Sequence, residues 1–325
     1  MQVKDNNNNF HYSRNYIKIF PIIIALLYLP VTRGDCSFSH GDVSLGSTNS
    51  FSLLHGSLQS SGKSGMFCSG FNATFLTHNT IRAQIISTLN NMKLKNQDFS
   101  TEENIPYLIY PDKNYQYAYK VGQEIDFDKL NLLSLIFSSN NSEIPLYIKT
   151  QRSTNVSSGL YEDVIQMKWE YSICRVGTLF LCFSNWKGKG FTTVKVHGSV
   201  NKECLINTIN DIDLGSTTST SLAKVTPLTA HITVSCTKKE HFNVWFTDGH
   251  FSHGGWRQMS DGLGHYIQYN IYHPDNNIIW NQNSKLGFTG LGSTQLITYQ
   301  VSVNNKQTNV TAGNYSDTIS IVVEY

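Results

Sequence analysis

Charged residues are scarce in this chain, and those present nearly cancel. Asp, Glu, Lys and Arg make up 15% of its 325 residues and leave a net charge of +2. A nucleic-acid-binding protein would show clustered Lys and Arg, and a membrane-surface binder would show a polybasic run. Neither is present, so both classes are excluded. The length suggests about two domains at roughly 150 residues each.

Long hydrophobic runs are also missing. The apolar run from Ile19 to Leu29 is interrupted by Pro21 and is far shorter than the roughly 20 residues that a membrane-spanning helix needs. Basic residues precede it, and the small residues Thr32 and Gly34 follow it, as in a signal peptide. We expect residues 1–34 to be a signal peptide and the mature chain to start at residue 35. A buried N-terminal helix is the alternative.

The sequence contains no CxxC pair, which argues against a structural zinc site. All six cysteines lie beyond residue 34, and an even number of cysteines in an exported chain implies disulfides. The same number of positions separates the first two cysteines as separates the last two, and the middle two flank a short loop. We therefore predict the pairs Cys36–Cys68, Cys174–Cys182 and Cys204–Cys236.

Catalytic and metal-binding motifs are likewise missing. His250, His253 and His265 lie in a Gly-rich segment without a matching carboxylate motif, so solvated loop histidines are favoured over zinc ligands. The segment 211–215 lacks the sixth-place Gly and the closing Glu of a calcium loop. The segment 61–65 lacks phosphate-loop spacing, and no Gly-x-Ser-x-Gly elbow occurs. We expect neither an enzyme nor a bound metal or cofactor.

What the sequence does contain is one unit used twice. Residues 42–48 (DVSLGST) resemble residues 211–217 (DIDLGST), and the Gly-x-Tyr-x-Asp motif at 159–163 recurs at 313–317. The order and spacing of these matches indicate a duplication. We predict two homologous domains, residues 35–200 and 201–325.

Short alternating segments predict an all-β protein built from two immunoglobulin-like sandwiches. Apolar and polar residues alternate in 231–236 and 266–272, which are separated by Gly- and Asn-rich turns, as in β-sandwiches. The stretch 313–325 alternates in the same way. Residues 81–97 are the exception, because Ile81, Ile85, Ile86 and Leu89 have helical spacing and suggest a helix there.

The two copies differ at their ends. The first copy continues beyond its Gly-x-Tyr-x-Asp strand into residues 192–200, where Val194, Val196, Gly198 and Val200 share one face. This spare strand can close the first sandwich. The second copy has no counterpart after its last strand, and a mature start at residue 35 leaves none in front. We therefore expect the second sandwich to be incomplete, with an open edge that another chain must cover.

These features resemble the spore coat protein U domain. The resemblance is carried by Leu214-Gly215, Trp245, Asp248-Gly249, Arg257-Gln258-Met259, Tyr269-x-Ile271-Tyr272 and Gly313-x-Tyr315-x-Asp317, together with Cys204 and Cys236. This domain serves as the pilin of archaic (Csu-type) chaperone–usher pili, and the two-copy layout looks like their two-domain tip adhesin. A secreted structural coat protein is the alternative.

The family implies how the incomplete sandwich is filled. A strand of a periplasmic pilus chaperone fills it first, and the N-terminal strand of the next pilin subunit replaces that strand at the outer-membrane usher. The family also implies export through the periplasm of a Gram-negative bacterium to the cell surface. Because this subunit can accept a strand but has none to give, we expect it at the pilus tip.

Two groups of residues are candidates for binding. Ile319, Ile321 and Val323 should contact the donor strand, unless they are ordinary core positions of a complete domain. For attachment to a surface, the disulfide-pinned loop 174–182 offers rigid apolar side chains, and the run 132–137 offers others. The residues chosen are Val176, Leu179, Phe180, Leu181, Leu132 and Leu133. Folding back onto the sandwich is the alternative for the loop, and a buried strand for the run.

Overall fold

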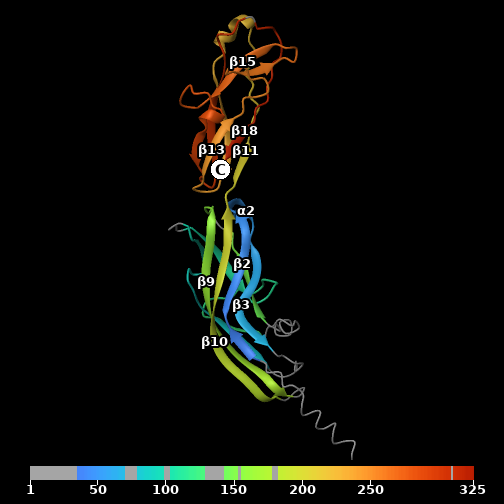
Figure 1. Ribbon diagram of the computed structural model, residues 1–325, viewed down its shortest axis with the longest axis vertical. Helices are drawn as coiled ribbons and strands as arrows, with labels where there is room; N and C mark the ends of the chain where they lie inside the picture. The colour runs from blue at the N-terminus through green and yellow to red at the C-terminus, as the bar shows by residue number, and fades with distance from the viewer. Residues whose placement is uncertain are drawn as a thin grey trace, which may run out of the picture.

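The computed structural model describes residues 35–69, 79–98, 103–128, 143–152, 155–177, 182–308 and 310–325. Strands dominate the described secondary structure, which confirms the all-β prediction (Figure 1). Within these ranges, no helix is long and apolar enough to cross a membrane.

The described residues between 35 and 201, here called the N-terminal half, form one ten-stranded sheet. The order is β10-β2-β3-β8-β6-β5-β9-β4-β7, β1 pairs with β3, and β10 also pairs with β9, so the sheet closes into a ring. A short helix, α2 (Ser50–His55), follows β2. The strands are β1 (Asp35–Phe38), β2 (His40–Asn49), β3 (Gln59–Ser69), β4 (Thr80–Thr88), β5 (Lys93–Asn96), β6 (Asn104–Tyr110), β7 (Glu124–Asp126), β8 (Glu143–Thr150), β9 (Gly159–Gly177) and β10 (Cys182–Asn201).

Residues 204–325, the C-terminal half, form two sheets in the orders β11-β12-β17-β15-β14 and β16-β13-β18. Each half has its own hydrophobic core, and Figure 1 shows the halves end to end along one long axis. The strands are β11 (Cys204–Thr208), β12 (Leu228–Cys236), β13 (His241–Phe246), β14 (Arg257–Ser260), β15 (Tyr266–Tyr272), β16 (Leu286–Thr289), β17 (Thr294–Val303) and β18 (Ile321–Glu324), with 3-10 turns η1 (Ser219–Lys224) and η2 (Gln282–Ser284).

The three disulfides predicted from spacing are present. Cys36 is bonded to Cys68 and Cys204 to Cys236, each across directly paired positions of neighbouring strands. The third bond, Cys174–Cys182, closes the hairpin between β9 and β10. Equivalent bonds therefore tie the first strand of each half to its neighbour.

The helix predicted for residues 81–97 is wrong. The segment forms β4 and β5, and Asn91 and Met92 turn the chain between them with left-handed φ angles of 55° and 58°. Ile81 and Ile85 are buried, but Ile86 is 40% exposed and Leu89 is 74% exposed. Buried positions alternate along β4, so the period of a strand describes its burial and the helical spacing was accidental.

The Gly-x-Tyr-x-Asp motif builds the same corner in both halves. The hydroxyl of Tyr161 donates to the carbonyl of Ser157 at 2.8 Å, and the hydroxyl of Tyr315 donates to the carbonyl of Thr311 at 2.7 Å. A tyrosine that bonds back to the backbone a few residues upstream is the tyrosine corner of immunoglobulin-like sandwiches. The motif thus fixes where β9 and the segment leading to β18 enter their sandwiches.

The two halves meet at a charged contact. Glu103, whose side chain is 11% exposed, lies 2.9 Å from the Nζ atom of Lys238 and 3.3 Å from that of Lys239. The amide and hydroxyl of Ser157 also donate to its carboxylate, at 2.8 and 2.6 Å. Burial alone would raise the pKa of Glu103, but these hydrogen bonds and the ammonium group of Lys238 outweigh it and lower the pKa to about 2.

Candidate functional site

In the N-terminal half, the spare strand closes the sandwich. The predicted alternating segment 192–200 forms the second part of β10, which pairs in parallel with β2 and antiparallel with β9. Val194 and Val196 are completely buried, and Val200 is 4% exposed. Strand β10 therefore fills the position between the first long strand of this half and its Gly-x-Tyr-x-Asp strand.

In the C-terminal half, the same position holds no strand among residues 204–308 and 310–325. Strand β18 pairs with β13 along one edge only. Residues 209–218, which correspond to β2 through the shared DxxLGST sequence, form no strand. The correspondence extends to backbone geometry, since Gly46 and Gly215 both have left-handed φ angles, of 74° and 79°. The two segments that would flank a closing strand, β18 and residues 209–218, thus lack that neighbour among the described residues.

Burial shows the consequence on the Gly-x-Tyr-x-Asp side. In β9, the side chains of Ile165, Met167 and Trp169 are completely buried, and β9 is paired with β10 along these residues. The residues at the same offset from the second motif are only half-buried, although they pack against the C-terminal core. They are Ile319, Ile321 and Val323, the residues predicted from the sequence for donor-strand contact.

The opposite side shows the same contrast. Val43 of β2 is completely buried and Leu45 is 8% exposed. Their counterparts Ile212 and Leu214 are half-buried and also pack against the C-terminal core. We call Ile212, Leu214, Ile319, Ile321 and Val323 the acceptor edge. It presents apolar side chains on both sides of the place that β10 fills in the other half.

A buried carboxylate fixes the end of the acceptor edge. The side chain of Asp317 is 2% exposed and accepts the hydroxyl proton of Tyr269 at 2.7 Å and the amide of His250 at 3.1 Å. Burial, followed by the hydrogen bond to Asp317, raises the pKa of Tyr269. A Cβ atom at Gly249 would lie 2.1 Å from a carboxylate oxygen of Asp317, so only glycine fits there. Asp163 and Tyr107 form the equivalent pair in the other half, at 2.9 Å.

The three histidines that the sequence raised as zinc candidates make hydrogen bonds within the loops of this region. The backbone amide of His250 bonds Asp317, and Nδ1 of His265 lies 2.6 Å from the carboxylate of Asp261. His253 exchanges backbone hydrogen bonds with Trp256. Within the described ranges, no group of three His, Cys, Asp or Glu side chains could hold a metal ion.

The predicted surface-binding residues lie largely outside the described part of the chain. Leu179, Phe180, Leu181, Leu132 and Leu133 all fall there, and of Val176 only its place at the end of β9 is described. The disulfide-closed hairpin that carries the first three reaches the end of the molecule farthest from the C-terminal half (Figure 1).

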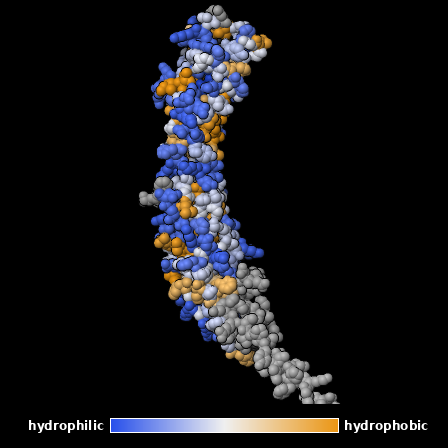
Figure 2. All heavy atoms as spheres, viewed as in Figure 1, coloured by the Kyte–Doolittle hydropathy of each residue, from blue (hydrophilic) through white to orange (hydrophobic). Residues whose placement is uncertain are grey.

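Two exposed aromatic residues on that hairpin escaped the sequence analysis. Phe183 is 69% exposed and Phe191 is 68% exposed, both on β10. Figure 2 shows apolar residues in orange beside the grey atoms at this end of the molecule. The usable signal was the alternation of 192–200, which places Phe191 on the outward face when it is extended by one residue.

Comparisons with known proteins agree with this architecture. The family model of the Spore Coat Protein U domain matches residues 24–168 and 191–322. Among solved structures, the chain is similar to the CsuC-CsuE chaperone–tip adhesion subunit pre-assembly complex from the archaic chaperone–usher Csu pili of Acinetobacter baumannii. That match has a TM-score of 0.60 at 21% identity and covers 90% of this chain and 100% of that one.

A second structure, the P pilus rod subunit PapA, matches 38% of this chain and 98% of its own, with 18% identity and a TM-score of 0.32. A comparison with curated proteins finds no match. Each of the two regions matched by the family model contains one Gly-x-Tyr-x-Asp motif, and together they cover most of the sequence. This chain therefore belongs to the Spore Coat Protein U domain family.

Proposed function

We propose that this protein is the tip adhesin subunit of an archaic chaperone–usher pilus, which attaches cells to surfaces and supports biofilm formation. In this proposal, residues 35–200 are the adhesin domain and residues 201–325 are the pilin domain that joins the fibre. The shared fold with the complex that contains the tip subunit CsuE supports it. It also implies that the protein is exported through the periplasm and displayed on the cell surface, and that it is not an enzyme.

The acceptor edge is the observation that carries the proposal. In one half the edge residues beside β10 are buried, and in the other the equivalent residues are only half-buried. The inward valines of β10 show what filling this position is worth, because each contributes roughly 1.5–3 kcal/mol when fully buried. An equivalent donor strand would stabilise the C-terminal half by several kcal/mol before the cost of ordering that strand.

The pairing of β10 also specifies the donor strand. By equivalence, the donor runs antiparallel to β18 and parallel to residues 209–218. It carries apolar side chains at every second position, as Val194 and Val196 do. A strand of the periplasmic chaperone supplies this pattern first, and the N-terminal strand of the next pilin supplies it after exchange at the outer-membrane usher.

The pairing of β1 supports a tip position in this proposal. This strand is paired with β3 from Asp35 onward, so β1 itself is engaged within this half and is not free to act as a donor strand. We propose that residues 1–34 are a signal peptide and are removed. The subunit then accepts a strand without donating one and occupies the end of the fibre.

Adhesion would take place at the opposite end of the molecule. The β9–β10 hairpin carries Leu179 and Phe180 between its cysteines, with Phe183 and Phe191 exposed on β10. Apolar side chains on a disulfide-closed hairpin lose little conformational entropy on binding. Replacing Leu179 and Phe180 with Ser should reduce surface attachment while pili still assemble. Attachment equal to the wild type would remove these two residues from the binding surface.

The acceptor edge can be tested with the chain's own closing strand. A peptide with the sequence of residues 190–201 (GFTTVKVHGSVN) should bind the full chain in a 1:1 ratio and raise its unfolding temperature. A control peptide with Lys in place of two of the inward valines, Val194 and Val196, should not bind. The variant Ile321→Asp should lose the peptide, whereas Thr318→Asp, on the outward face, should keep it.

A different result would favour the coat-protein alternative. If the full chain without chaperone or peptide is a stable monomer whose β18 amides are fully protected from hydrogen exchange, the C-terminal half is complete. The chain would then not need a donor strand, and the pilus assignment would fail.

A further inference from the structure

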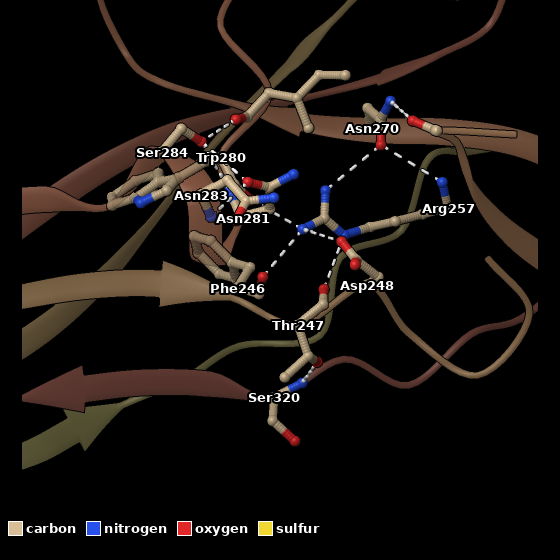
Figure 3. A network of polar contacts seen from close by, with 12 residues as sticks. Phe246, Thr247, Asp248, Arg257, Asn270, Trp280, Asn281, Asn283, Ser284 and Ser320 are labelled. Atoms are coloured by element: carbon tan, nitrogen blue, oxygen red, sulfur yellow. Dashed lines mark hydrogen bonds and ion pairs between the residues drawn. The ribbon is translucent and has the colours of Figure 1, made fainter. Parts of the chain in front are cut away.

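Arg257 is the largest charged side chain buried in the C-terminal half. It is 1% exposed, and its guanidinium group donates to three backbone carbonyls (Figure 3). Nε donates to Thr247 at 2.8 Å, and Nη2 donates to Phe246 at 3.1 Å and to Trp280 at 2.8 Å. The nearest carboxylate, Asp248, is 3.7 Å away and 64% exposed. Backbone carbonyls, rather than a buried counter-ion, therefore compensate the charge.

These contacts continue one edge of β13 where its strand partner stops. Strand β16 pairs with β13 only over His241–Val244. The indole of Trp280 donates to the carbonyl of Val244 at 2.7 Å, and the guanidinium group of Arg257 donates to the carbonyls of Phe246 and Thr247. Side-chain donors thus take the place of a neighbouring strand along this part of β13.

On its other side, β13 pairs with β18, which carries Ile321 and Val323 of the acceptor edge. Phe246 pairs with Ile321. The amide of Thr247 donates to the carbonyl of Ser320 at 2.9 Å, and its hydroxyl accepts the amide of Ser320 at 2.8 Å. The path from Arg257 through Thr247 to Ser320 contains only hydrogen bonds between directly contacting groups, and Figure 3 shows these residues together. Arg257 therefore holds the backbone on which Ile319 and Ile321 are mounted.

In the N-terminal half, the equivalent strand carbonyl is hydrogen-bonded without an arginine. Ile85 corresponds to Phe246, because it pairs with Met167 as Phe246 pairs with Ile321. Its carbonyl accepts a backbone amide, that of Gly122, at 2.7 Å. Arg257 lies opposite Tyr269, the first tyrosine of the repeated Tyr-x-Ile-Tyr segment. Extending the β5–β6 register by one residue places Met92 opposite the equivalent Tyr107, whose amide donates to the carbonyl of Met92. The half that is closed by its own strand has methionine at this position, and the half with the open edge has arginine.

We propose that Arg257 is a positioning residue that keeps the acceptor edge in strand geometry before a donor strand arrives. The proposal rests on the proposed function, because it assigns the residue to the uptake of the donor. In the N-terminal half, β10 holds β9 from its free side. In the C-terminal half that support is lacking until a donor binds, and the arginine supplies it from the far side of β13.

The test uses three variants of the full chain. Arg257→Met introduces the residue of the closed half, Arg257→Lys keeps the charge but not the fork of donors, and Ile297→Val is a control that trims the buried core on β17. Hydrogen exchange of the amides of Thr247 and Ser320–Val322 is measured without a donor. The affinity of the 190–201 peptide is then measured for each variant.

Arg257→Met should speed exchange of these amides at least tenfold relative to the amides of β12 and β17, and should weaken peptide binding by a similar factor. Arg257→Lys should fall between this variant and the wild type, and Ile297→Val should change neither ratio. Uniform acceleration of exchange across both sheets by Arg257→Met would overturn the proposal, as would wild-type peptide affinity. Failure of the wild-type chain to bind the peptide would instead contradict the proposed function, because the exchange experiment tests the support of β18 without any donor.

Discussion

Replacing Val196 by alanine tests whether β10 closes the N-terminal half in the way that we propose for a donor strand in the C-terminal half. Val196 is completely buried and pairs with Val43 on one side and Asp163 on the other. The substitution removes two methyl groups from the centre of the closing strand. It leaves the backbone hydrogen bonds in place, so the change probes side-chain burial alone.

The expected cost has two parts. Two buried carbon groups at about 0.8 kcal/mol each give about 1.6 kcal/mol. The cavity left behind adds to this, and a total of about 2–3 kcal/mol is expected. A single domain is stable by about 5–15 kcal/mol, so one alanine should remove a large share of the stability of this half. Lys195→Ala, at the exposed neighbouring position, is the matched control and should cost at most about 1 kcal/mol.

Hydrogen exchange resolved by peptide fragment reads the two halves separately. Because about 1.4 kcal/mol corresponds to a tenfold change, Val196→Ala should accelerate exchange in β2, β9 and β10 by about 30- to 150-fold. Exchange in β12 and β17 should stay as in the wild type. Equal effects of Val196→Ala and Lys195→Ala would refute the role of β10 as the strand that closes the N-terminal half.

Three further changes test the contact of Glu103 between the two halves, the Cys204–Cys236 disulfide and the tyrosine corner. Glu103→Gln should lower the free energy of unfolding by about 1–3 kcal/mol at pH 7. Because folding lowers the pKa of Glu103 from 4.5 to about 2, the stability that this carboxylate gives the wild type should be lost as the pH falls through that range. Urea unfolding of the variant at several pH values should not show this loss. Replacing Cys204 and Cys236 by Ser should cost about 3–4 kcal/mol, read as a lower midpoint in urea, whereas an unchanged midpoint would contradict it. Tyr161→Phe should cost about 1 kcal/mol and Tyr315→Phe less until a donor peptide is bound, as thermal unfolding with and without the peptide would show; equal losses without peptide would contradict this.

The features that could be predicted from the sequence are those with a local or repeated signal. Alternation in 192–200 identified the strand that became the second part of β10. The equal spacing within the pairs Cys36–Cys68 and Cys204–Cys236 identified these two disulfides. It did so because in each copy the strand with the first cysteine pairs with the strand that carries the second. The half-burial of Ile319, Ile321 and Val323 agrees with the face predicted from alternation.

Features that depend on distant parts of the chain were missed. The role of Arg257 depends on the carbonyls of Phe246, Thr247 and Trp280, which no periodicity connects to it. The helical spacing of Ile81, Ile85, Ile86 and Leu89 was misleading because β4 buries one face only and its end turns away at Asn91. Sequence spacing alone does not show whether the tertiary structure buries such a segment with the period of a helix or with that of a strand.

The duplication makes the open edge interpretable, because each half serves as a control for the other. Both halves share the tyrosine corner, the buried Tyr–Asp pair and the disulfide, so a difference in burial between equivalent positions cannot be ascribed to a different fold. The largest change between the copies at these positions is the presence of β10 in one and of no described strand in the other. A strand from another chain would make the two halves alike, and this is why we interpret the half-buried apolar residues beside β18 as a binding site rather than as a loosely packed core.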